Sequence, residues 1–576
     1  MNIQEHFKLP IYYNSQKKQV NKNIIHDLEL VQTMDSSLNP IYSFFFNLRE
    51  KNNFQYSVLN QSVELYTTDI DFLKDSQALL KNYKVFNHRY TANNNDISNS
   101  FQKIQTIWND IKNDTGFKEK YYYIDWPMWE FLNNSESFLQ FMSIYNMTSP
   151  VISLLLPIII LIVPFFIIQL KGLHLTFEEY IEVLKIVISQ HALGKLFSEF
   201  NDVSLNQKMY LLVSAAFYIF SIYQNILLCT RFHQNMCKIH DYFQEISEYL
   251  NFTISNMEHY LSFTKDLTTH SEFNKKTIEK LDDLRELHNK ISGITEYKFT
   301  VRKFFEIGSI LKYFYEIYDN KKYNDALLYS FGFNGYAECL NGILFNLEQR
   351  KIHFIEFTKN KKKTIFKKNY YAALKDLKPV KNTVKLSKNI IITGPNASGK
   401  TTVLKSTLIN ILLSQQFGCG FYDSGSKLSV YDNIHCYLNI PDTSGRDSLF
   451  QAEARRCKEI IDFIHDRKSE THFCVFDELY SGTNPEEAET SAISFMDYLV
   501  KKNNVSTILT THYNKVCKTL EKNDTIVNYY MNVSVDEKND FQYTYVLLKG
   551  ISNTKGGIKV LKDMNYPKEI LEKIIH

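Results

Sequence analysis

Apolar residues change their spacing along the chain, and in the first 136 residues they recur at intervals of three and four. Two stretches show this most clearly, one from Ile25 to Leu38 and the other from Ile70 to Tyr83. Such spacing is typical of helices that bury one face, and the asparagine-rich breaks between stretches are typical of loops. We therefore expect a helical N-terminal region over residues 1–136.

The pattern then changes abruptly, because no charged side chain occurs from Ser137 to Leu170. Residues 151–170, at the end of this segment, are almost entirely apolar. About 20 helical residues span about 30 Å, which is the thickness of the hydrocarbon core of a bilayer. Pro157 and Pro164 also favour a membrane helix, since proline disrupts the interior of soluble helices but is tolerated in membrane ones.

A second uncharged run covers residues 209–230 and is weaker, because Gln224 and Asn225 lie inside it. Together the two runs predict a transmembrane hairpin over residues 137–230. Two spans return the chain to the side from which it started. The intervening residues 171–208 carry a balanced charge, so the positive-inside rule gives no orientation. The alternative is a pair of core helices buried in a helical bundle.

After residue 230 the polar helical pattern returns, with apolar stripes over residues 239–250 and 278–291. Stripes at helical spacing indicate packing seams, so we predict a helical lever or core region over residues 231–350. A basic linker follows at 351–389, and its stretch Lys359–Lys368 carries six lysines. Such a run is typical of a solvated loop, and the alternative is a contact with an anionic partner, either nucleic acid or lipid.

Composition narrows the class of protein. The chain of 576 residues is long enough for several domains, and its formal net charge of +3 favours no partner. Eight cysteines are scattered without a Cys-x-x-Cys pair, which argues against a disulfide framework or a zinc ribbon and fits a reducing, intracellular compartment. The N-terminus does not show a basic-then-apolar pattern, so we expect no secretion.

Residues 394–401 read Gly-Pro-Asn-Ala-Ser-Gly-Lys-Thr, which is a complete phosphate-binding loop of the pattern G-x-x-x-x-G-K-[ST]. The apolar run Ile390–Ile392 precedes it and a helical pattern follows, which is the context that the motif needs. Glycines let backbone N–H groups surround phosphates, and the helix N-terminus adds partial positive charge. The loop predicts binding of a nucleoside triphosphate by Gly394, Pro395, Asn396, Ala397, Ser398, Gly399, Lys400, Thr401 and Thr402.

Four side chains are predicted to handle the phosphates, the metal and the water. Lys400 can reach the β- and γ-phosphates, and the Thr401 hydroxyl can bind Mg²⁺. About 80 residues later an apolar strand pattern ends in Asp477 and Glu478. Asp477 would hold Mg²⁺, and Glu478 would polarise the attacking water.

A further apolar strand pattern, residues 505–511, ends in His512. A histidine at this place can sense the γ-phosphate by donating a hydrogen bond as charge develops there. The sequence therefore predicts catalytic roles for Lys400, Glu478 and His512 and metal-binding roles for Thr401 and Asp477.

Several segments together resemble the MutS family of DNA mismatch repair ATPases. Residues 393–402 look like the family's phosphate loop with its Gly-Pro-Asn opening, 477–484 look like its Asp-Glu-x-x-x-Gly-Thr segment, and 511–513 match its Thr-His-Tyr. Residues 444–453 are similar to its serine-rich signature, with one extra residue. Residues 543–550, 556–558 and 566–571 are similar to its closing strand and helix.

The resemblance covers roughly residues 380–576 and implies an α/β domain of the ABC-type P-loop ATPase class over residues 390–576. It implies ATP and Mg²⁺ as cofactors and a homodimer as the working form. Ser448 would then be presented to the nucleotide of the partner and would complete that site in trans. Residues 381–384 lie where family members place a further nucleotide contact.

The resemblance does not extend to mismatch recognition. Mismatch-reading MutS proteins carry an N-terminal domain with a Phe-x-Glu wedge, whereas the triplets Phe243–Glu245 and Phe304–Glu306 lie far from the N-terminus in helical or uncertain segments. The family also includes shorter MutS-related proteins with membrane segments, and this chain is more similar to those.

The sequence therefore predicts a dimeric, intracellular, MutS-like ATPase. It associates with a membrane through residues 151–170 and 209–230, and its ATPase domain lies on the cytosolic side. Duplex DNA is a candidate partner. Two alternatives stay open: a soluble repair protein that binds mismatched or branched DNA, and a membrane scaffold in which the nucleotide acts only as a dimerisation switch.

Overall fold

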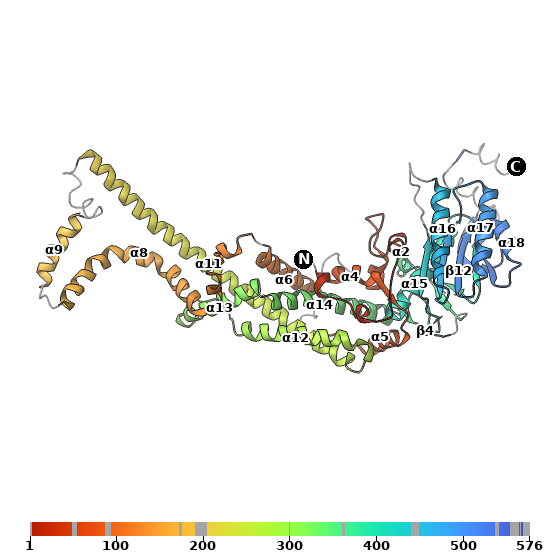
Figure 1. Cartoon of the computed structure of the whole chain (residues 1–576), viewed down its shortest axis with the longest axis horizontal. Helices are drawn as coiled ribbons and strands as arrows, with labels where there is room; N and C mark the ends of the chain where they lie inside the picture. The colour runs from red at the N-terminus through yellow and green to blue at the C-terminus, as the bar shows by residue number, and fades with distance from the viewer. Residues whose placement is uncertain are drawn as a thin grey trace. The chain divides into compact units, whose positions relative to one another are not determined.

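A six-stranded sheet organises the C-terminal third of the chain (Figure 1). Its strand order is β10-β11-β12-β7-β13-β14, and the first five strands run parallel while β14 pairs antiparallel with β13. Parallel strands that are covered on both faces are continuous apolar runs, and every residue of β7 is buried accordingly. The strands are β7 (Asn389–Thr393), β10 (Asn433–Tyr437), β11 (His472–Asp477), β12 (Val505–Thr511), β13 (Ile526–Val535) and β14 (Phe541–Lys549).

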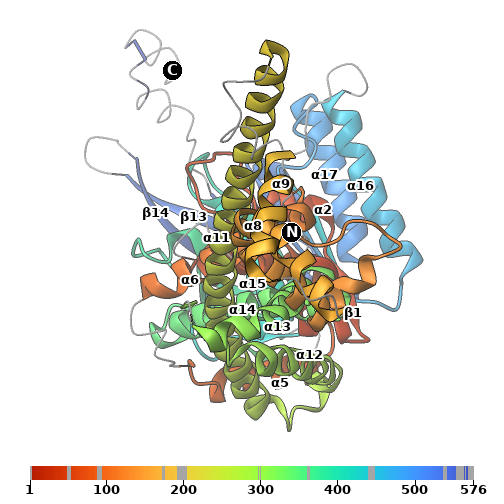
Figure 2. The ribbon, with the colours of Figure 1, turned by 90° about the vertical axis from the view of Figure 1, so that its left-hand side faces the viewer.

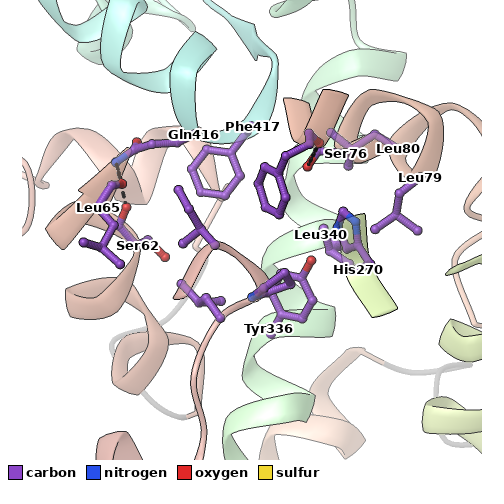
Figure 3. A pocket seen from close by; sticks show the side chains of 14 residues that line it. Ser62, Leu65, Ser76, Leu79, Leu80, His270, Tyr336, Leu340, Gln416 and Phe417 are labelled. Carbon is purple, nitrogen blue, oxygen red and sulfur yellow. Dashed lines mark hydrogen bonds between the residues drawn. The ribbon is translucent and has the colours of Figure 1, made fainter. Parts of the chain in front are cut away.

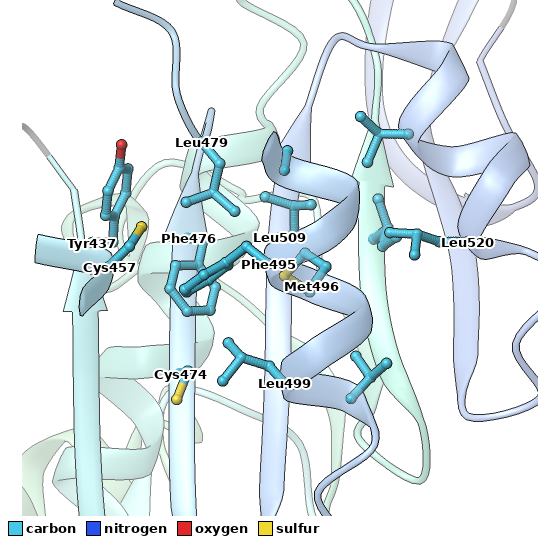
Figure 4. Packing of buried hydrophobic residues seen from close by; sticks show 14 of the residues in the cluster. Tyr437, Cys457, Cys474, Phe476, Leu479, Phe495, Met496, Leu499, Leu509 and Leu520 are labelled. Carbon is cyan, nitrogen blue, oxygen red and sulfur yellow. The ribbon is translucent and has the colours of Figure 1, made fainter. Parts of the chain in front are cut away.

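Helices cover both faces of this sheet. Successive strand side chains point to opposite faces, so Phe476 and Leu509 face α17 (Pro485–Val500), where Phe495 and Met496 pack against them (Figure 4). Alternate residues of β11 and β12 face α15 (Lys400–Phe417), which contacts both strands. The helices α16 (Leu449–Asp466) and α18 (Asn514–Leu520) join α17 in the same apolar cluster.

The structure is a computed structural model, and its chain divides into two compact units. The first comprises residues 1–94, 255–281 and 327–576, and the second comprises residues 95–254 and 282–326. The domain boundaries predicted at residues 136, 230, 350 and 389 stay predictions. The structure describes residues 3–48, 54–86, 94–113, 115–171, 176–190, 204–295, 297–298, 300–359, 363–438, 448–535, 541–552, 564 and 566–567.

In the first unit the N-terminal segments pack directly on the end of α15. Tyr42 donates a hydrogen bond to the side chain of Gln416, and the Gln77 amide donates to the carbonyl of Gly418 at 2.7 Å. Tyr66 donates to the carbonyl of Asp432 at 2.8 Å. These bonds satisfy polar groups that burial would otherwise leave unpaired, so residues 1–94 and the sheet form one body.

A small apolar cavity of about 40 Å³ lies in this body (Figure 3). The side-chain amide of Gln416 at its wall donates to the carbonyls of Ser62 and Leu65 and accepts from Tyr42, so both of its N–H groups are already bonded. The cavity is a gap in packing and takes no part in the site. Its other lining residues include Leu9, Phe72, Leu79, Leu80, His270, Tyr336, Leu340 and Phe417.

The second unit is helical. Helix α13 (Val301–Asp319) packs against α8 (Glu136–Leu170), and the two approach closely at Gly308. A Cβ atom there would lie 2.5 Å from the carbonyl oxygen of Glu136, so only glycine fits. The backbone N–H of Gly308 donates to Gln140 Oε1 at 2.8 Å, which fixes the crossing.

Two helices of this unit carry the long apolar runs. Helix α8 includes residues 151–170, and α11 (Leu205–Thr264) includes residues 209–230. Within the part of the chain that the structure describes, the segment Lys208–Thr264 is long and apolar enough to cross a membrane, and its most apolar stretch is almost entirely exposed. The side chains at positions 156–161, 164, 165 and 169 of α8 lie outside what the structure describes.

Within the two apolar runs most of the described large apolar side chains are exposed, and polar side chains pair between the helices. Phe217 and Ile219 are 70% and 66% exposed. Between the helices, the Asn225 amide donates to Ser153 Oγ at 2.6 Å, and Tyr218 donates to the carbonyl of Ser153 at 3.1 Å. Most of the described large apolar side chains of these runs are therefore exposed in the single chain, although Leu211 is 4% exposed, and the buried bundle considered as an alternative is not what the described residues form.

The helical expectations for the N-terminal region have different outcomes. The helix predicted from Ile70 to Tyr83 is confirmed as α5 (Ile70–Asn82), which Asp69 caps by accepting from two backbone N–H groups. The helix predicted from Ile25 to Leu38 is wrong, because α2 (Lys22–Asp27) ends at Asp27. Glu29 has a φ of 51°, which a helix cannot continue through, and its carbonyl accepts from Ile41 instead.

The remaining elements are short or link these parts. In the first unit they are α1 (Ile3–His6), η1 (Pro10–Tyr13), β1 (Lys17–Gln19), α3 (Ile41–Phe45), α4 (Phe54–Glu64), β2 (Leu65–Thr67), η4 (Thr268–His270), β3 (His353–Phe354), β4 (Glu356–Phe357), β5 (Ile365–Asn369), η5 (Ala372–Leu374), β6 (Asn382–Lys385), β8 (Cys419–Gly420) and β9 (Lys427–Leu428). The others are α6 (Asn94–Lys112), α7 (Phe117–Lys120), η3 (Glu130–Asn134), α9 (Phe177–Gln190), α12 (Ser271–Ile291) and α14 (Lys321–Glu348).

Candidate functional site

The predicted phosphate loop connects the end of β7 to the start of α15. Gly399 is the N-cap of α15 and has a φ of 95°, a conformation that glycine adopts without strain. A Cβ atom on Gly399 would lie 3.2 Å from the ring of Tyr545 in β14, and one on Gly394 would lie 2.8 Å from Ser398 Oγ. The loop is therefore packed closely against β13 and β14, the two paired strands that are labelled in Figure 2.

Lys400 is buried at the centre of this loop, with 5% of its surface exposed. Its ammonium donates to the carbonyls of Gly394 at 3.0 Å and Pro395 at 3.2 Å, and it lies 3.7 Å from Glu478 Oε1. Burial lowers the pKa of Lys400, and the charges of Glu478 and Asp477 oppose that shift. The cation thus bridges the loop to the carboxylates at the end of β11.

Thr401 and Asp477, the two predicted metal ligands, are in direct contact. Thr401 Oγ1 donates to Asp477 Oδ2 at 2.9 Å and lies 3.2 Å from Oδ1, and the hydroxyl of Thr510 donates to the same carboxylate. Among the described residues no group of three or more His, Cys, Asp or Glu side chains could hold a metal ion. Mg²⁺ needs only one or two protein ligands when phosphates and waters supply the others, and one hydroxyl with one carboxylate matches that number.

Glu478 and His512, predicted to act on water and the γ-phosphate, lie beside each other. His512 Nδ1 is 3.6 Å from Glu478 Oε1. The neighbouring His512 first, and then the charge of Lys400, hold the pKa of Glu478 below its usual range. Glu478 has a φ of 51°, and its N–H donates to the carbonyl of Thr510 at 3.0 Å. The strained backbone turns the carboxylate toward Lys400 and His512.

Ser448 stands apart from these residues, at the start of α16. Its Oγ accepts from the N–H of Gln451 at 3.3 Å, and its own N–H donates to Gln451 Oε1 at 3.0 Å, which forms a capping box. Ser448 is exposed, so this helix N-terminus faces solvent in the single chain. Residues 444–447 of the predicted signature lie outside the described residues, as do most of residues 553–576.

Glu453 was not among the predicted site residues, and it lies on α16 against the loop after Glu478. Glu453 is 2% exposed, and its carboxylate accepts from Ser481 N at 3.1 Å, Ser481 Oγ at 2.9 Å and Gly482 N at 3.2 Å. A usable signal was present, because positions 450, 453, 454 and 457 share one face of a helix and only 453 is charged. A lone acid on an apolar face indicates a buried polar contact.

Asn382 also forms hydrogen bonds to β14 that could not be predicted from the sequence. Its side-chain amide donates to the carbonyl of Tyr545 at 2.9 Å, and its Oδ1 accepts from the N–H of Leu547 at 2.8 Å. Tyr545 has a φ of 56° and is 45% exposed beside Gly399. Asn382 thus positions the strand whose tyrosine borders the phosphate loop, and a nucleotide contact by residues 381–384 stays a prediction.

Comparison with known proteins finds a family match to this part of the chain. Residues 390–575 match the family model described as MutS domain V. The DNA mismatch repair protein MutS of Persephonella marina is 28% identical over 213 residues, which is 36% of this chain and 24% of that protein. The MutS of Prochlorococcus marinus is 31% identical over 224 residues, 38% of this chain and 24% of that protein.

A third relative is the Endonuclease MutS2 of Lactococcus lactis subsp. cremoris, which is 27% identical over 197 residues. The match covers 34% of this chain and 24% of that protein. The chain therefore spans about a quarter of the length of the curated relatives that it matches.

Proposed function

The chain belongs to the MutS family through residues 390–575, and from this premise we propose that its C-terminal domain is an ABC-type P-loop ATPase that binds MgATP and hydrolyses it. The proposal rests on one observation: the candidate residues lie close together at one edge of the sheet. Lys400 and Thr401 begin α15 after the carboxyl end of β7, and Asp477 and Glu478 stand at the carboxyl end of β11. Thr401 donates to Asp477 at 2.9 Å, and Lys400 lies 3.7 Å from Glu478. Ligands of open parallel sheets bind at this edge.

Each residue then has a role that its surroundings support. Lys400 exchanges the carbonyls of Gly394 and Pro395 for the β- and γ-phosphates of ATP. Thr401 and Asp477 hold Mg²⁺, which neutralises phosphate charge when bound. Glu478 is kept ionised by its lowered pKa, so it can accept a proton from the attacking water. His512 orients Glu478 and donates to the γ-phosphate.

A homodimer completes this proposal. In the family arrangement the start of α16 faces the nucleotide of the partner, and here that N-terminus is capped and exposed at Ser448. A helix N-terminus carries partial positive charge and attracts phosphate. The test is phosphate release from MgATP by the purified full chain, together with its sedimentation with and without ATP. Phosphate release that needs no Mg²⁺, or that is equal in a stable monomer, contradicts the proposal.

We further propose that the α8–α11 hairpin inserts in a membrane, with the ATPase domain in the cytosol. The supporting observation is the pairing of Ser153 with Tyr218 and Asn225 between two helices that expose Phe217 and Ile219. In lipid, polar side chains must find partners between helices while apolar ones face outward. Release of the chain from membranes by high salt or alkaline pH without detergent contradicts this proposal.

DNA repair is the third element of the proposal and rests on the relatives alone. Two of them are named DNA mismatch repair proteins, and duplex DNA with a mismatch or a branch is the partner to test. Anisotropy of a labelled duplex, measured at several salt concentrations, checks it, because phosphate contacts release counterions. Tight ATP binding with negligible turnover would instead favour a scaffold in which the nucleotide acts as a dimerisation switch.

A further inference from the structure

Positive charge is concentrated between residues 350 and 388. This segment has thirteen basic and two acidic side chains, a net charge of +11, whereas the whole chain has a net charge of +3. Like charges so close together repel each other unless an anion lies among them. Three of these lysines form ion pairs, Lys351 with Asp376 and both Lys368 and Lys381 with Asp423. Within this segment the predicted nucleotide contact involves residues 381–384 alone, so the positive charge that lines the groove described next requires another explanation.

An open groove of about 620 Å³ lies where this segment meets helix α5. Lys74 and Lys81 of α5 and Arg350 line it together, and among the described residues that line it Glu356 is the only acid. Glu356 forms an ion pair with Lys427 at 3.0 Å, so its charge is already neutralised. A fourth cation stands at the rim, because Lys367 Nζ is 2.7 Å from the place where a Cβ of Gly425 would lie.

Two aromatic rings share the groove with these cations. Phe354 and Phe357 line it and are each partly exposed. Lys81 Nζ lies 5.0 Å from the centre of the Phe354 ring, where a cation is attracted to the ring face. Alternating cations and partly exposed aromatic rings are the two components of surfaces that bind single-stranded nucleic acid, since cations follow the phosphates and bases stack on the rings.

The wall of the groove is fixed in place by buried hydrogen bonds. The amide of Gln77 donates to the carbonyls of Ile355 at 2.8 Å and Gly418 at 2.7 Å, and His353 Nδ1 is bonded to the carbonyl of Tyr422 at 2.7 Å. These contacts join α5, β3 and the loop after α15. A preformed wall lowers the entropy that a ligand must overcome to order its site.

We propose that this groove binds a short stretch of single-stranded nucleic acid, with its phosphates on Lys74, Lys81 and Arg350 and a base against Phe357. The geometry favours this ligand over a duplex, whose stacked bases cannot reach a ring at the wall of a groove. The geometry also favours single-stranded nucleic acid over a lipid surface, because the cations line a concave groove whereas a bilayer presents a broad, flat face. The proposal is independent of ATP hydrolysis.

The test uses the full chain in detergent and a fluorescein-labelled oligothymidine of 20 nucleotides. The groove variant is Lys74→Glu/Lys81→Glu/Arg350→Glu. The matched control is Lys468→Glu/Lys518→Glu/Lys522→Glu, which makes the same charge change at exposed lysines outside the groove. We expect the wild-type chain and the control to bind alike and the groove variant to bind at least tenfold more weakly. The slope of log affinity against log salt should fall by about 2 for three lost phosphate contacts.

A second variant separates stacking from charge. Phe357→Ala should weaken binding about fivefold or more while leaving the salt slope unchanged, because it removes a ring and no charge. Thermal melting of each variant shows whether it is folded. Equal affinity of the wild-type chain and a folded groove variant overturns the proposal. Tighter binding of a matched duplex, or of labelled dihexanoyl phosphatidylserine, than of the oligothymidine also overturns it.

Discussion

The C-terminal sheet and the α8–α11 hairpin differ in where they place apolar and polar side chains. In the sheet, Ile391 and Leu509 are fully buried. At its edge Thr401 donates to Asp477, and Lys400 donates to the carbonyl of Gly394. In the hairpin, most of the described large apolar side chains are exposed, whereas Ser153 and Asn225 bond to each other.

Exposed and buried apolar side chains have different free energies in water. Burying a large apolar side chain from water stabilises a fold by about 1.5–3 kcal/mol, so a soluble domain hides it. A long exposed apolar surface in water marks an interaction site or a membrane contact. One chain therefore contains a region whose apolar side chains are buried and a region whose apolar side chains are largely exposed, and we propose that the second region meets lipid. The following changes test each side of that comparison.

The largest effect is expected for Lys400→Ala in the water-facing site. In the proposed complex the Lys400 ammonium donates charge-assisted hydrogen bonds to two phosphates of ATP. Their loss should weaken ATP binding by about 3–5 kcal/mol and abolish turnover. Calorimetric titration with ATP measures the affinity. The control is Lys405→Ala, further along α15, and the alkaline extraction of both variants should equal that of the wild type. Unchanged ATP affinity in Lys400→Ala would show that the loop does not hold the triphosphate.

The next effect is on turnover alone. Glu478→Gln removes the base but keeps the shape, so ATP should bind while hydrolysis falls by about 10²–10⁴-fold. Single-turnover measurements with radiolabelled ATP separate the two steps. The matched control is Glu486→Gln in the exposed first turn of α17. Hydrolysis by Glu478→Gln at the wild-type rate would mean that another group activates the water.

The third change tests the lipid-facing region. Phe220 is 56% exposed on α11, and Phe220→Arg should disfavour insertion by about 2.5–3.5 kcal/mol if that side chain meets lipid. The fraction of chain that resists alkaline extraction should then drop, whereas Phe220→Leu should leave it unchanged. In a water-exposed hairpin the same arginine would improve solubility and change nothing else.

A smaller effect is expected where α16 meets the catalytic loop. Glu453→Gln keeps the size of the side chain but loses the charge that strengthens the bonds to Ser481 and Gly482. We expect turnover to fall about tenfold with ATP affinity nearly unchanged, since a bond to a charged group contributes about 1.5–3 kcal/mol. Glu459→Gln on the exposed face of α16 is the control. A parallel loss of ATP affinity would indicate general disruption instead of loop positioning.

The smallest effect is on pH dependence. The pKa of Glu478 is held low by His512 first and Lys400 second, so the carboxylate stays ionised at a pH where an ordinary glutamate takes up a proton. Its contribution to stability is therefore present above the unfolded pKa and is lost as pH falls through the folded one. His512→Ala should move the acidic limb of the rate profile to higher pH. His465→Ala, at an exposed histidine, should leave the limb in place.

Local patterns sufficed for much of the site. The phosphate loop is contiguous in sequence, and parallel strands bring their carboxyl ends to one edge, so the proximity of Lys400 and Asp477 could be expected. The α5 helix could be predicted because its cap, Asp69, and its apolar spacing agree. Agreement between local signals is what makes a segment predictable.

Contacts between distant residues could not be predicted. Asn382 bonds to Tyr545 and Leu547 across more than 160 residues, and Tyr42 bonds to Gln416 across 374. Periodicity reports which face of a helix is buried and does not report its partner. The error over Ile25–Leu38 has the same origin, because the backbone turns at Glu29 to bond with Ile41 instead of continuing the helical pattern.

The exposure of the cysteine thiols differs along the chain, so their labelling can locate the end of the apolar run. All eight thiols are free, six of them are buried, and the two partly exposed ones, Cys229 and Cys237, both lie on α11. They are about two turns apart on that helix, just where its apolar run gives way to polar residues. A water-soluble maleimide applied to the native chain would therefore label only the border of the apolar segment, and the ratio of the two labelled thiols would report how deeply that border sits.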